Sequence, residues 1–195
     1  MIKKAMLYYS RRDLWNLFLL CAFPLHIWTL LLSFNDVSWL SARTNMWDAI
    51  GVISYGMIFA LLETLFLFLF AVFLGYFISP CWGSGKRVVL IGSLVLILSI
   101  WAMLTQLFSM LNWSVPVSWI DYLVASGHPA RIFYPLLLAF VVSSVVIPVY
   151  AILRVEKIHL LINDLADRIY LLTTVYLGLD AMAFIIVTIR NIQGS

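Results

Sequence analysis

The sequence is poor in charge. Of its 195 residues, 11% are Asp, Glu, Lys or Arg, whereas 64% are apolar, and the mean hydropathy is +1.05. A soluble domain carries about a quarter charged residues and is about half apolar. The shortage of charge therefore excludes a soluble globular domain and a disordered chain, and it predicts an integral membrane protein.

Cysteine and clustered basic residues are also scarce. Cys21 and Cys81 are the only cysteines, one in an apolar run and one in a basic turn. They are expected at different depths, and disulfide geometry is strict, so we expect no bridge between them. The 12 Lys and Arg residues exceed the 9 Asp and Glu residues only slightly and are scattered. No basic stripe for nucleic acid is present, and we expect no nucleic-acid partner.

Long apolar runs are abundant. A helix needs about 20 apolar residues to cross a hydrocarbon core about 30 Å thick. Five segments reach this length: 14–34, 50–79, 88–111, 132–153 and 169–189. The sequence therefore predicts an all-α fold, a bundle of five transmembrane helices in a single membrane domain over residues 1–195, with the lipid bilayer as its first partner.

Two connections are predicted to be helical as well. Residues 118–125 are expected to form a short helix on the outer membrane surface, capped by Ser118 and stopped by Gly127. Residues 155–168 show helical periodicity and are expected to form an inner amphipathic helix.

The last transmembrane helix is expected to start near Asn163, a residue that favours helix N-termini. Asp164 and Arg168 have the i,i+4 spacing of an ion pair on the polar face of a helix.

The basic residues predict an orientation. Cytoplasmic loops carry the excess of Lys and Arg. With five crossings, nine of these residues fall on the side of the N-terminus, and three, Arg43, Arg131 and Arg190, fall on the other. We therefore expect a cell-membrane protein with a cytoplasmic N-terminus and its C-terminus outside.

Three ionisable residues fall near the centres of predicted spans. His26, Glu63 and Asp180 each lie within about 3 Å of the middle of their own helix, at 1.5 Å per residue. No Lys or Arg falls inside any predicted span, so His26 is the one side chain there that can become a cation. Such residues usually face the bundle interior and find partners. A neutral, hydrogen-bonded set of the three is expected, as a structural contact or as a proton relay.

Weakly polar residues on the other predicted helices can support such a set. Small and hydroxyl-bearing side chains gather where membrane helices meet. The candidates are Ser99, Gln106, Ser143, Ser144, Thr173 and Tyr176. Placement of Glu63 or Asp180 toward lipid would instead indicate contact with a partner subunit.

The charged residues of the predicted outer loops form a weaker candidate. They can line a pocket for lipid headgroups, although a solvated role is favoured. They are Arg43, Asp48, Asp121, His128 and Arg131.

The sequence predicts no cofactor and no metal site, since a haem between helices needs histidine ligands and only His26 lies in a span. Without a sizeable extramembrane segment, the favoured function is a non-enzymatic scaffold, anchor or regulatory subunit bound to another membrane protein or to a second copy. The alternative is a proton- or cation-coupled transporter or channel that uses the midplane carboxyls. A lipid-modifying membrane enzyme is the third hypothesis.

Overall fold

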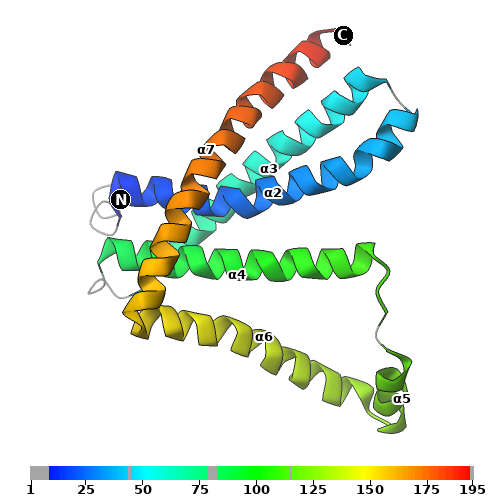
Figure 1. Ribbon diagram of the computed structural model, residues 1–195, viewed down its shortest axis with the longest axis vertical. Coiled ribbons are helices and arrows are strands. Elements are labelled where there is room, and N and C mark those ends of the chain that lie inside the picture. Colours follow the sequence, from blue (N-terminus) through cyan, green and yellow to red (C-terminus); the bar gives the residue numbers. More distant parts are fainter. Residues whose placement is uncertain (1–8, 44, 79–82, 115, 194–195) are drawn as a thin grey trace.

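The computed structural model describes residues 9–43, 45–78, 83–114 and 116–193 (Figure 1). The described residues form helices and no strands: α2 (Arg11–Arg43), α3 (Met46–Gly75), α4 (Ser84–Met110), α5 (Val117–Ala125), α6 (Pro129–Arg154) and α7 (Glu156–Gln193). Within these ranges, five helices, all but α5, are long and apolar enough to cross a membrane. The predicted all-α fold class is confirmed.

The long helices run back and forth between two ends of the molecule. The start of α2, the end of α3, the start of α4 and the α6–α7 turn gather at one end, while the end of α2, the start of α3, α5 and the end of α7 lie toward the other (Figure 1). Helices α2, α3 and α7 form a group, α4 lies along α2, and α6 diverges from α4 toward α5. This order is the one that five successive membrane crossings require.

The core lies where α2 packs against α3, α4 and α7. Leu17, Cys21 and Ala22 of α2 are completely buried. Cys21 is a free thiol, and Cys81 lies outside the described residues, so the prediction about a bridge is not tested there. The buried hydrophobic cluster comprises Tyr9, Leu17, Leu20, Cys21, Ala71, Val88, Ile91, Val95, Ala166 and Ile169.

Helix α6 lies at the edge of the bundle. None of the residues in its membrane-length segment is buried, compared with 22–39% for the other four long helices. Trp101 attaches it to α4: its indole Nε1 donates to Ser144 Oγ at 2.8 Å, and its ring packs edge-on against Phe140 at 5.5 Å. Most of the α6 surface therefore faces the surroundings of the molecule.

Helix α2 begins earlier and ends later than the predicted span 14–34. The amide of Asp13 donates to Ser10 Oγ at 3.1 Å, and the amide of Ser10 donates to Asp13 Oδ2 at 2.9 Å. This reciprocal capping satisfies amides at the helix start. At the other end the helix continues to Arg43. Polar residues mark the end of the apolar span there, but they do not stop the helix.

Residues 156–168 are helical, as predicted, but they are the start of α7 and not a separate helix. The chain reverses at Val155, which has extended backbone angles (φ −108°, ψ 106°), and α7 then runs unbroken through Asn163. A β-branched residue adopts this conformation readily, so no Gly or Pro is needed. The 38 residues of α7 extend about 57 Å and must tilt in the membrane or project beyond it. The Asp164–Arg168 pair is confirmed, with Nε–Oδ2 at 3.2 Å.

Helix α5 matches the predicted range 118–125 within a residue. Pro116, and not Ser118, occupies its N-cap position, and Gly127 follows its end with a φ of +71°. The glycine is needed there because other residues rarely adopt this conformation. None of the α5 residues is buried. Its place on the membrane surface stays a prediction.

Close packing at the N-terminal end of the bundle depends on Gly75 of α3. A Cβ atom at this position would overlap the hydroxyl of Tyr9 and approach Ile91 Cδ1 to 2.8 Å. The guanidinium of Arg87 lies 5.5 Å from the centre of the Tyr9 ring, and burial raises the pKa of the Tyr9 phenol to about 12. The absent side chain of Gly75 therefore creates the space that holds Tyr9.

We expect Gly75→Ala to lower the free energy of unfolding by about 1–3 kcal/mol, the usual effect of overpacking a core. Gly178→Ala is the matched control, because a Cβ at Gly178 meets nothing within 4 Å. Unfolding of both variants in mixed detergent micelles measures the difference. Equal stability of the two variants would show that Gly75 does not set this packing.

Candidate functional site

A buried hydrogen bond joins α2 to α7. His26 Nε2 lies 2.8 Å from Asp180 Oδ2, and the two residues are 154 positions apart in the sequence. His26 is 0% exposed and Asp180 is 4% exposed. Two of the three ionisable residues predicted near the membrane centre therefore meet inside the bundle.

The second ring nitrogen of His26 defines the protonation of this pair. His26 Nδ1 lies 2.8 Å from the carbonyl oxygen of Ala22. A carbonyl oxygen only accepts hydrogen bonds, so Nδ1 carries a proton. Nε2 and Oδ2 then share one further proton, as imidazolium with carboxylate or as neutral imidazole with carboxylic acid. Both forms carry no net charge, which suits an apolar interior.

A tyrosine of α7 packs on the pair, and a buried threonine lies two turns before Asp180 on the same helix. The Tyr176 ring lies parallel to the His26 ring at 6.3 Å between centroids. Thr173 is completely buried and donates to the carbonyl of Ile169 at 2.7 Å. Asp180 Oδ1 is buried and has no hydrogen-bond partner among the described residues. The carboxyl group thus keeps one acceptor atom that the pair does not use.

Local sequence features bring the two helices together. Ala22 on α2 is 0% exposed and Ala183 on α7 is 3% exposed, and such small side chains let membrane helices approach closely. Pro24 lies inside α2, two residues before His26. It has no N–H to donate to the preceding turn, which loosens the helix beside the site.

Glu63 does not join the pair. It lies on α3 with its side chain exposed, and no hydrogen bond or ion pair links it to another described residue. A charged side chain near the bilayer centre costs about 2.5–3.5 kcal/mol when it has no partner. Its neighbours Phe59 and Phe66 are 62% and 73% exposed, so the carboxyl interrupts an apolar surface.

The supporting residues predicted on other helices are dispersed. Tyr176 lies at the pair, whereas Thr173 bonds within α7, and Ser144 and Gln106 accept hydrogen bonds from the indoles of Trp101 and Trp28. Ser143 donates to the carbonyl of Phe140 at 3.0 Å.

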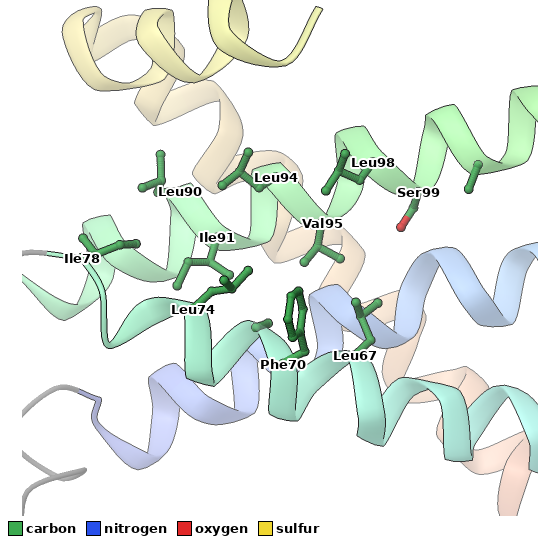
Figure 2. Close-up of a pocket in the computed structure, with 12 residues that line it drawn as sticks. Leu67, Phe70, Leu74, Ile78, Leu90, Ile91, Leu94, Val95, Leu98 and Ser99 are labelled. Carbon is green, nitrogen blue, oxygen red and sulfur yellow. The ribbon is translucent and has the colours of Figure 1, made fainter. Parts of the chain in front are cut away.

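Ser99 lines an apolar groove between α3 and α4 (Figure 2). The polar residues of α4 and α6 therefore do not extend the His26–Asp180 site.

An ion pair at the other end of the bundle was not expected from the sequence. Arg190 Nη2 lies 2.7 Å from Asp48 Oδ1, and Arg190 Nη1 donates to the carbonyl of Trp47 at 2.6 Å. A Cβ on Gly51 would lie 2.5 Å from the Arg190 guanidinium. Asp48 precedes the predicted span 50–79, and Arg190 follows the predicted span 169–189. Their positions at span ends were the only sequence feature that could have indicated this ion pair. The Asp48 carboxylate is therefore occupied by α7 and is not a free headgroup ligand.

The described residues contain no group of three His, Cys, Asp or Glu side chains placed to hold a metal ion. Comparison of the chain with protein-family models, with curated proteins and with solved structures gave no match. The geometry of the site joins two helices through one buried, shared proton.

We expect a double-mutant cycle to show strong coupling between His26 and Asp180. His26→Leu and Asp180→Leu each leave a buried polar partner unpaired and should cost about 1–3 kcal/mol. The double variant removes both partners and should cost less than the sum. Thr174→Val is the control, since Thr174 is exposed and donates only within α7. Additive losses in the free energy of unfolding would contradict the coupling.

Proposed function

We propose that this chain is a multi-pass protein of the cell membrane that acts as a non-enzymatic subunit, holding or regulating another membrane protein. The observation that carries the proposal is the exposure of α6, whose membrane-length segment has no buried residue. The basic-residue count supports a cytoplasmic N-terminus and an outer C-terminus.

The face of α6 that points away from α4 is suited to close helix packing. Ala139, Val142 and Val146 are spaced by three and four residues, so they share one face, roughly opposite Ser144. All three are exposed, Val142 by 48% and Val146 by 56%. Association of helices in lipid depends on van der Waals packing, which small side chains favour. This face is the surface that we assign to a partner.

The burial of the central pair supports a structural role for it. Neither His26 nor Asp180 lines the groove between α3 and α4 or the cavities beside Lys86 and Leu165. A sealed hydrogen bond between α2 and α7 fixes the bundle on which α6 is displayed. A buried core combined with an exposed helix at the edge of the bundle is typical of a subunit that assembles with another membrane protein.

We expect Ala139→Trp to reduce assembly of the chain into larger complexes, because the indole prevents close approach to the α6 face. Ala181→Trp is the matched control, an exposed alanine on α7. The size of the complexes extracted from native membranes in a mild detergent measures the effect. Wild-type protein that extracts only as a lone monomer would count against the proposal.

Proton coupling is the second candidate function, and the protonation of the pair favours it. Nε2 and Oδ2 share one proton, and Asp180 Oδ1 is an unused acceptor beside it. Separation of α2 from α7 would open the pair to water and allow this proton to exchange. The chain would then act as a proton-coupled carrier with Asp180 as the exchanging carboxyl group.

If the second candidate is correct, vesicles that contain the wild-type protein and a pH-sensitive dye should show a proton flux that Asp180→Asn abolishes. Glu63→Gln should leave the flux unchanged, because Glu63 lies away from the pair. A wild-type protein without flux, in vesicles where it is folded, would remove this candidate.

A further inference from the structure

An apolar groove runs between α3 and α4 and leads toward Glu63. The groove has a volume of about 460 Å³ and is lined by apolar residues apart from Ser99. Figure 2 shows Leu67, Phe70 and Leu74 projecting from α3 toward α4, with the Ser99 hydroxyl directed from α4 to the α3 side. The volume is within the range of sites that hold ligands or side chains.

Glu63 continues the α3 wall of this groove. Residues 63, 67, 70 and 74 are spaced by four, three and four positions, so their side chains share one helix face. The carboxyl group of Glu63 therefore lies one turn beyond Leu67, near the middle of α3, which begins at Met46 and ends at Gly75. The apolar groove and the exposed carboxyl group form one continuous surface.

We propose that this surface, the Glu63 groove, binds a transmembrane helix of a different protein that carries a Lys or Arg at mid-membrane depth. The apolar side chains of that helix fill the groove, and its cation pairs with Glu63. The inference rests on the proposed role as an assembling subunit, but it uses a face on α3 and α4 and not the α6 face.

The charge of the surface decides between possible occupants. An acyl chain can fill the groove but offers nothing to the carboxyl group. A second copy of this chain brings no cation to that depth, because every Lys and Arg of the sequence lies at or beyond the end of an apolar span. The two described cations that flank the apolar span of α7, Arg168 and Arg190, are already paired with Asp164 and Asp48. A partner helix with its own basic residue satisfies both parts of the surface.

The proposal is tested with the full chain in phosphatidylcholine vesicles and a labelled, leucine-rich transmembrane peptide with one central lysine. The reference peptide has leucine at that position. Energy transfer between labelled protein and peptide measures binding. We expect the lysine peptide to bind at least tenfold more tightly than the leucine peptide, and Glu63→Gln to abolish the difference.

Two variants test the groove itself. Ala102→Phe adds bulk at an exposed position that lines the groove and should weaken binding of the lysine peptide at least tenfold. Ala181→Phe, an equivalent change on α7, should have no effect. Retained cooperative unfolding of each variant shows that it is folded.

Three results would overturn the proposal. Equal binding of the two peptides would indicate occupation by lipid or by any apolar helix. Tight binding that survives Ala102→Phe would show that the groove takes no part. Energy transfer between two labelled copies without peptide, lost in Glu63→Gln, would indicate self-association. None of these results concerns complex formation through α6. The proposed function is therefore tested separately, by the Ala139→Trp experiment.

Discussion

The hydrogen bond between His26 and Asp180 is the constraint on which the rest of the structure depends. It connects the first long helix to the last, and both of its side chains are almost completely buried. Because the Ala22 carbonyl holds one ring nitrogen in its protonated form, the pair contains a single shared proton and no net charge. Loss of either member would leave the other buried without its partner, which is costly in a low-dielectric interior.

The bundle around this bond is tightly built at its two ends. Near the N-terminal end, Tyr9 packs into the space that Gly75 leaves open, and the guanidinium of Arg87 lies over the Tyr9 ring. At the opposite end, Arg190 joins α7 to α3 through Asp48 and the carbonyl of Trp47. Helices α2, α3, α4 and α7 thus form a closely packed core. Helix α6 is attached to this core chiefly through Trp101. The contrast between this core and the open surfaces on α3, α4 and α6 is the physical basis of the proposed role in assembly.

Hydropathy was sufficient to locate the five long helices, because the thickness of a bilayer imposes a length on every crossing. It was insufficient where a helix continues into polar sequence, as at the end of α2 and the start of α7. The exact position of the reversal, at Val155, was not predicted for a related reason. Turns are recognised by Gly and Pro, and this turn uses extended backbone at one ordinary residue.

The candidate site was predictable in part. His26, Glu63 and Asp180 gave the same signal, an ionisable residue near mid-span, yet two are buried together and one faces outward. The sequence position of a residue fixes its depth along a helix. Whether its side chain points into the bundle or outward depends on which helices pack beside that helix. The Arg190–Asp48 pair shows the same limit, since its members are 142 residues apart. The sequence identifies which groups need partners, and the packing decides which partners they receive.

The most direct measurement is solid-state nitrogen NMR of His26 in lipid vesicles. The structure requires that Nδ1 is protonated and bound to the Ala22 carbonyl, and that the Nε2 signal shifts in Asp180→Asn while the Nδ1 signal does not. A ring with an unprotonated Nδ1, or an Nε2 signal that does not respond to Asp180→Asn, would contradict the shared proton that joins α2 to α7.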